Sequence, residues 1–240
     1  MTPRTIVILT ARDEADRLGE TLDALARAFP GAPVVVADDG SRDGTAGVAR
    51  SRGARVVARK RPVGKGGAAT PAAREALALG SPDTVYVLCD GDLGGSARGL
   101  TALEQAVRGG ADLAVAAFAH RAGGGFGLAL GFAGWAIRRL GGPRLGAPIS
   151  GQRALSARAL GEVLPFAPRF GMEIGMTVDA ARAGLRIVEV ELPLVHRATG
   201  RDWRGFVHRA RQLGDFVCVY LDRRRRRPRG PITSRGAGIG

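Results

Sequence analysis

The chain has 240 residues, 45% of them hydrophobic, which suits one large α/β domain with a substantial core. No apolar run is long enough to cross a bilayer, and the two cysteines lack metal-site spacing, so we predict a cytoplasmic protein. The formal net charge of +14 does not describe the domain itself, because half of it comes from the seven arginines of residues 223–240.

The first 60 residues alternate between strand and helix patterns. Strands are predicted over residues 5–9, 33–37 and 55–57. The first helix has an apolar stripe at Leu18, Leu22, Leu25 and Phe29. Each of the first two strands is followed by a helix long enough for a right-handed parallel crossover. Because the second strand leads directly into Asp38-Asp39-Gly40, we expect a ligand crevice at the carboxyl edge of the sheet.

A glycine-rich segment, Gly64-Lys65-Gly66-Gly67, opens the next predicted helix, which runs to Leu79. Backbone N–H groups at a helix N-terminus and one ammonium group together suit a phosphate. The segment is not a Walker loop, because the spacing and the Ser or Thr after the lysine are missing. A simple flexible loop is the alternative interpretation.

A strand-forming run from Val85 to Cys89 leads into Asp90-Gly91-Asp92. A continuous apolar run is typical of a strand that is buried on both faces of a parallel sheet. Two carboxylates at its end would repel each other unless a cation lies between them, and oxygen ligands suit Mg²⁺ or Mn²⁺. The alternative is a solvated Asp-Gly turn.

The second half of the chain continues the alternation. Leu100, Leu103 and Val107 indicate a helix, and strands are predicted over residues 113–118 and 185–192. Glu173 begins a helix after a turn rich in proline and glycine, which is a position that suits a cleft. A carboxylate at a helix N-terminus also has a plain structural role, because it stabilises the helix dipole.

The last predicted helix spans residues 203–221, and its apolar positions indicate packing against the core or a partner, which leaves a homodimer open. We expect Cys218 in this helix and Cys89 in the central strand to be small buried residues. Proline and glycine interrupt the arginines that follow, so we predict a folded domain over residues 1–222 and a disordered tail over residues 223–240. Two roles of this basic end are compatible with the sequence: peripheral contact with a membrane, or simply keeping the protein soluble.

Four motifs in order resemble the family 2 glycosyltransferases with the GT-A fold. They are the acid-containing loop after the first strand, the acidic segment 38–45, Lys65-Gly66-Gly67 and Asp90-Gly91-Asp92. The resemblance implies a single α/β domain, in which helices flank a mostly parallel, Rossmann-like sheet. It also implies a metal-dependent enzyme that uses a nucleoside-diphosphate sugar.

The second half narrows the resemblance. Residues 165–175 and Val195-His196-Arg197 resemble glucosyl-3-phosphoglycerate synthases, and Met172-Glu173 with residues 189–193 more weakly resembles dolichyl-phosphate mannose synthases. Together the resemblances cover about residues 4–215. They imply transfer of a hexose, with glucose from UDP-glucose as the first choice.

The acceptor is a separate expectation. Where the phosphoglycerate enzymes carry a Gly-Arg-x-Thr motif, this chain has Gly123-Gly124-Gly125-Phe126-Gly127, without the arginine or the threonine. We therefore hypothesise that 3-phosphoglycerate is a poor acceptor and that a lipid-linked or other larger acceptor is used.

The resemblance also assigns roles to residues. Glu173 would be catalytic, as a general base in an inverting reaction or as a group that orients the sugar in a retaining one. Asp92 and His196 would bind Mn²⁺ or Mg²⁺, and an imidazole beside carboxylates favours Mn²⁺. The residues expected to bind the nucleotide sugar are Ala11, Glu14, Asp38, Asp39, Lys65, Asp90, Gly91, Gln152, Arg153, Arg197 and Arg201.

Two other functions compete with this assignment. A nucleotidyltransferase has a similar sheet order, but it would need a glycine-rich loop after the first strand, where this chain has Thr10 to Glu14. A nucleic-acid-binding protein could act through the arginine tail. Acids in a groove repel nucleic-acid phosphates unless a metal is present, so we expect no nucleic-acid partner.

Overall fold

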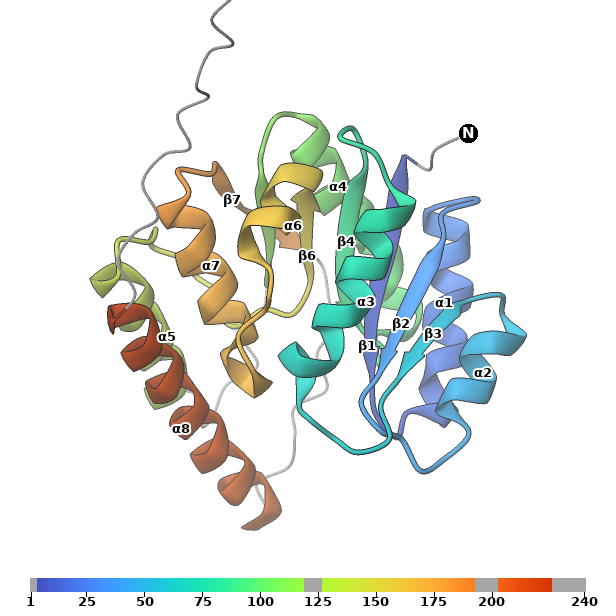
Figure 1. Cartoon of the computed structure of the whole chain (residues 1–240), viewed down its shortest axis with the longest axis horizontal. Coiled ribbons are helices and arrows are strands. Elements are labelled where there is room, and N and C mark those ends of the chain that lie inside the picture. The colour runs from blue at the N-terminus through green and yellow to red at the C-terminus, as the bar shows by residue number, and fades with distance from the viewer. Residues whose placement is uncertain (1–3, 119–126, 193–202, 226–240) are drawn as a thin grey trace, which may run out of the picture.

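A seven-stranded sheet with the order β3-β2-β1-β4-β6-β5-β7 forms the centre of the chain (Figure 1). The computed structural model describes residues 4–118, 127–192 and 203–225. The strands are β1 (Thr5–Ala11), β2 (Val34–Asp38), β3 (Arg55–Ala58), β4 (Val85–Asp90), β5 (Leu113–Phe118), β6 (Arg153–Ser156) and β7 (Ile187–Leu192).

The sheet is mixed but mostly parallel, as predicted. β1 pairs in parallel with both β2 and β4, β2 with β3, and β5 with β7. Only β6 is antiparallel among the described strands, and it lies between β4 and β5. The three parallel strands β1, β2 and β4 therefore bring their carboxyl ends to one edge of the sheet.

Helices cover both faces of the sheet. One core layer joins α1 and α4 to a face that includes Val7 and Leu9, and the other joins α3, α6 and α7 to the face that includes Ile6 and Ile8. Burial on both faces explains why β1 and β4 read as continuous apolar runs. The helices are α1 (Ala15–Ala28), α2 (Thr45–Ser51), α3 (Lys65–Leu79), η1 (Gly94–Leu100), α4 (Thr101–Arg108), α5 (Gly127–Arg139), α6 (Ala157–Val163), η2 (Arg169–Gly171), α7 (Met172–Arg182) and α8 (Trp203–Arg225).

A third apolar layer joins α5 and α8 to the outer side of α7 (Figure 1). Phe216 of α8 is fully buried in this layer. The prediction that both cysteines are buried is confirmed for Cys89 and wrong for Cys218, which lies on the exposed side of α8. Within the described ranges, no helix is long and apolar enough to span a bilayer.

The start of the arginine-rich tail differs from the prediction, because α8 continues through Arg223 to Arg225. Arg223 is 3% exposed, and its guanidinium donates to Asp179 of α7 at 2.7 and 2.9 Å. A buried ion pair ties this arginine to the fold, so the domain extends at least to Arg225. Residues 226–240 lie outside the described part of the chain, and their disorder stays a prediction.

A pair of truncations tests this boundary. A chain that ends after Asp222 should lose roughly 2 kcal/mol of stability, because Asp179 would lose its buried cation. A chain that ends after Arg225 keeps the ion pair and should unfold within about 0.5 kcal/mol of the full chain. Urea unfolding followed by circular dichroism measures both, and equal midpoints for the two truncations would contradict the assignment.

Candidate active site

The carboxyl ends of β1, β2 and β4 bring four of the predicted residues together. Thr10 of β1 is in register with Asp90 of β4, and Ala11 is in register with Asp38 of β2. The Asp39 N–H donates to the carbonyl of Ala11 at 3.0 Å, which continues the pairing one residue past the end of β2. The predicted acids therefore meet at one edge of the sheet, where a ligand of a doubly wound fold binds.

Lys65 is the centre of this cluster. It begins α3, and its Nζ lies 2.7 Å from Asp90 Oδ1 and 2.9 Å from Glu173 Oε1. The Lys65 side chain is only 20% exposed, and burial by itself lowers its pKa. The charges of Asp90 and Glu173 outweigh burial and raise the pKa of Lys65 above its usual value. The lysine is therefore a fixed cation between two carboxylates.

Asp90 is held from three sides. Besides Lys65, the hydroxyl of Thr10 donates to its Oδ1 and the amide of Gln152 donates to its Oδ2, both at 3.0 Å. Burial alone would raise the pKa of Asp90. The charge of Lys65 and these hydrogen bonds outweigh burial and lower the pKa below its usual value, so the carboxyl is ionised. A Cβ on Gly151 would collide with Lys65 Nζ and Asp90 Oδ2, so a larger residue at this position would displace the ion pair.

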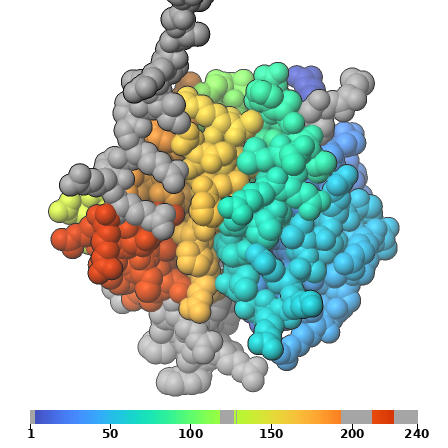
Figure 2. Space-filling model, viewed as in Figure 1, coloured from blue at the N-terminus to red at the C-terminus, as the bar shows by residue number. Residues whose placement is uncertain are grey.

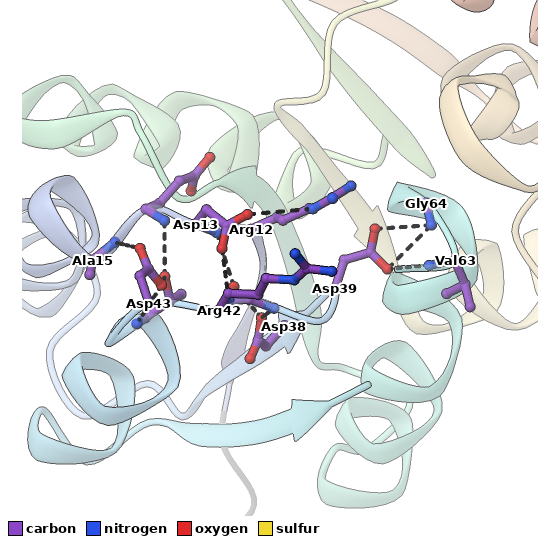
Figure 3. A network of polar contacts seen from close by, with 12 residues as sticks. Arg12, Asp13, Ala15, Asp38, Asp39, Arg42, Asp43, Val63 and Gly64 are labelled. Atoms are coloured by element: carbon purple, nitrogen blue, oxygen red, sulfur yellow. Dashed lines mark hydrogen bonds and ion pairs between the residues drawn. The ribbon is translucent and has the colours of Figure 1, made fainter. Parts of the chain in front are cut away.

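Asp38 and Asp39 organise the loops that follow β2 and β3 (Figure 3). Both are buried, at 3% and 6% exposure. Asp39 accepts hydrogen bonds from the backbone N–H groups of Val63 at 2.7 Å and Gly64 at 2.9 Å. Asp38 accepts from the Ser41 backbone and hydroxyl. Asp39 therefore positions the turn that presents Lys65.

A second acid network, which sequence reasoning missed, fixes the turn between β1 and α1 (Figure 3). Asp13 has a positive φ of 54° and accepts a hydrogen bond from the Arg42 N–H at 2.8 Å. Asp43 accepts from the Ala15 N–H at 3.1 Å and from Thr45, and these bonds lower its pKa. Aspartate tolerates the left-handed region, which suits Asp13 to this turn. Asp13 and Asp43 lie within two of the family-like motifs, but their sequence gives no sign that each accepts from the other loop.

Glu14 lies against the Asp90-Gly91-Asp92 segment. A Cβ on Gly91 would collide with Glu14 Oε2, and this oxygen is buried without a hydrogen-bond partner among the described residues. Burial, together with the charges of Asp92 and Asp90, raises the pKa of Glu14 to about 8. A buried acceptor without a donor suits a ligand that carries a hydroxyl, an N–H or a positive charge.

The donor chemistry at this edge fits a hard divalent cation. Asp92 is exposed at the end of the motif, beside Asp90 and Glu14, and carboxylate oxygens are the ligands that Mg²⁺ and Mn²⁺ prefer. Among the described residues no three side chains form a complete protein metal site, so substrate oxygens or further residues would complete the shell. The predicted ligand His196, and Arg197 and Arg201 with it, lie outside the described residues.

Arg153 is fully buried, and among the described residues its hydrogen bonds go to structural groups and not to the acid cluster. Its guanidinium donates to the carbonyls of Pro148 and Ser150 and to the hydroxyl of Thr177 at 2.9 to 3.1 Å. Burial lowers the pKa of Arg153 to about 10, and the charge of Glu173 opposes that shift. In this arrangement the side chain supports the loop before β6 and the first turns of α7.

The sequence also matches a family model. Residues 6–133, more than half of the chain, match the model described as glycosyl transferase family 2. The chain belongs to glycosyltransferase family 2. The matched residues contain Glu14, Asp38, Asp39, Lys65, Asp90 and Asp92. No curated protein sequence matches the chain.

Solved structures of a family 2 enzyme cover nearly the whole chain. Glucosyl-3-phosphoglycerate synthase from Mycobacterium tuberculosis, in complex with Mn²⁺, UDP-glucose and phosphoglyceric acid, is 28% identical, with a TM-score of 0.72. The match covers 92% of this chain and 79% of that one. The same enzyme with Mg²⁺ and UDP is 27% identical, with a TM-score of 0.73 and the same coverage of both chains. These likenesses confirm the GT-A-like fold and the resemblance to glucosyl-3-phosphoglycerate synthases.

Proposed function

We propose that this family 2 glycosyltransferase transfers a hexose, with glucose as the first choice, from UDP-glucose in a metal-dependent reaction. The observation that carries the proposal is the Lys65 cluster, in which one fixed cation joins the carboxylates of Asp90 and Glu173 at the ligand edge of the sheet. The likeness to an enzyme solved with UDP-glucose and Mn²⁺ supports the choice of donor and metal.

In this proposal each predicted site residue has a separate role. Lys65 binds the diphosphate, because it is cationic and begins a helix whose N-terminal N–H groups favour anions. Glu14, Asp38 and Asp39 border the nucleoside, and Asp92 with His196 holds Mn²⁺ or Mg²⁺. The metal would neutralise charge on the departing diphosphate. Glu173 is the catalytic residue, and its ion pair with Lys65 keeps it ready to accept a hydrogen bond from a sugar or acceptor hydroxyl.

The expectation about the acceptor rests on residues 123–127 of the sequence. Residues 123–127 lack the arginine and threonine of the phosphoglycerate enzymes, so we expect 3-phosphoglycerate to be a poor acceptor. A lipid-linked or other larger acceptor is expected instead. The two arms of the assay are therefore 3-phosphoglycerate in solution and polyprenyl phosphate in vesicles.

Purified protein with UDP-glucose and Mn²⁺ should release UDP and give a glucosylated product that mass spectrometry identifies. EDTA should abolish both, and Asp92→Ala should weaken metal-dependent UDP binding by at least about 10-fold in calorimetry, because one ligand of the cation is lost. Asp83→Ala, an exposed acid just before β4, is the matched control. Activity that survives EDTA would contradict the proposed metal requirement. Efficient formation of glucosyl-3-phosphoglycerate would contradict the proposal of a lipid-linked or other larger acceptor.

A further inference from the structure

Exposed large apolar side chains gather on one part of the surface. Four such side chains occur among the described residues, and three of them lie on α5 and α8. Trp135 of α5 is 43% exposed, and Val217 and Leu221 of α8 are 37% and 41% exposed. The fourth, Val63, lies in the loop before α3. Apolar side chains that form one contiguous patch are typical of an interaction site, whereas singly exposed ones are ordinary.

The three side chains belong to one continuous surface. The ring of Trp135 lies 5.0 Å from the ring of Tyr220, which lies between Val217 and Leu221 on the same side of α8. We call Trp135, Val217, Tyr220 and Leu221 the α5–α8 face. Both helices reach the molecular surface at one edge, outside α7 (Figures 1 and 2). Their inner sides are packed, because Phe216 and Val219 are buried.

A basic cavity adjoins this face. It has a volume of about 430 Å³ and is lined by Arg139, Leu140, Gly141, Arg182, Tyr220 and Arg224. The lining residues include three arginines and no acid. Arg182 is fixed in place, because its Nη1 donates to the carbonyl of Arg223 at 2.8 Å. Tyr220 belongs to both the cavity and the apolar face, so the two features form one surface.

We propose that the α5–α8 face binds an anionic membrane surface, with the arginine cavity receiving a lipid phosphate. Tryptophan and tyrosine favour the boundary between headgroups and acyl chains, and arginines attract anionic headgroups. The sequence that follows Arg225 contains four more arginines and no acid, namely Arg226, Arg227, Arg229 and Arg235. A second copy of this chain is a poorer occupant, because a symmetric contact would oppose the arginines of one copy to those of the other.

Vesicle flotation with the full chain tests the proposal. The protein should float with vesicles of phosphatidylcholine containing about 30% phosphatidylglycerol, and much less with phosphatidylcholine alone. The double variant Trp135→Ser/Leu221→Ser should reduce partitioning at least 10-fold, and Arg139→Gln/Arg224→Gln should do the same. Val63→Ser, which removes an equally exposed apolar side chain elsewhere, should bind vesicles like the parent.

The arginine tail requires its own control, because it also attracts anionic lipid. Tail attraction is screened at about 0.5 M salt, whereas insertion of apolar side chains persists. In a Trp203→Phe background, Trp135 is the single tryptophan, and its emission should shift to the blue on anionic vesicles. Two results would overturn the proposal: unchanged partitioning of the Trp135→Ser/Leu221→Ser variant, or a dimer in light scattering that this variant dissociates. Thermal melts of each variant show that it is folded.

Discussion

Replacing Lys65 with methionine is expected to lower folding stability by roughly 3 kcal/mol and transfer activity by at least about 100-fold. Methionine keeps the length of the side chain but removes the charge, so Asp90 and Glu173 would face each other without a cation. Their side chains are only 28% and 7% exposed, and water would compensate poorly. The loss of activity follows separately, because the diphosphate would lose its fixed positive partner.

Lys60→Met is the matched control, since Lys60 is the only other lysine and is exposed. Urea unfolding and initial rates with UDP-glucose measure both effects. The stability deficit of Lys65→Met should shrink at acidic pH, where one of the two carboxyls can take up a proton. A variant as stable as the parent at neutral pH would show that the lysine does not hold the two acids together.

Glu14→Gln is expected to stabilise the metal-free protein at alkaline pH. The pKa of Glu14 is raised from 4.5 to about 8 in the folded protein, first by burial and then by Asp92 and Asp90. Between these values the folded state holds a proton that the unfolded chain releases, so stability should fall as pH rises from about 4.5 to about 8. Glutamine needs no proton. Because water reaches part of the Glu14 side chain, we expect about half of the full linkage energy, so the variant should exceed the parent by ~2–3 kcal/mol near pH 8.

Urea unfolding in EDTA at several pH values measures the difference in the free energy of unfolding between the parent and Glu14→Gln. The two proteins should be equally stable below about pH 4.5. Glu162→Gln on α6 is the control and should keep the parent's pH dependence. The Glu14→Gln variant should bind UDP more weakly than the parent, since the substitution exchanges a carboxyl group for an amide. Parallel stability curves for parent and Glu14→Gln would mean that Glu14 is not the buried proton site.

The fold was predictable where burial alone decides the pattern. β1 and β4 are buried on both faces, and their apolar runs gave their positions to within two residues. β6 was missed, because Arg153 begins it and only Ala154 and Leu155 are apolar. A buried arginine looks like a loop residue in a sequence, since nothing shows in advance that three acceptors surround it.

The candidate site was predictable as a set of residues but not as a set of contacts. Lys65, Asp90 and Glu173 each stood out, by resemblance and by local pattern. Their shared ion pair depends on packing that joins α3 to residues far along the chain: a Cβ on Gly66 would collide with the Ala167 carbonyl, just before α7. Thr10 was missed as a partner of Asp90, because register across β1 and β4 is a property of the assembled sheet.

Arginine so dominates the basic residues that primary amines are scarce in this protein. All but two of its 36 lysine and arginine residues are arginines, and the two lysines differ sharply in environment. Lys60 is exposed, whereas Lys65 is protonated between two carboxylates and is a poor nucleophile toward acylating reagents. Among the side-chain amines, acylation of the folded chain should therefore modify Lys60 alone, and acylated Lys65 would report that the pairing at the active site has opened.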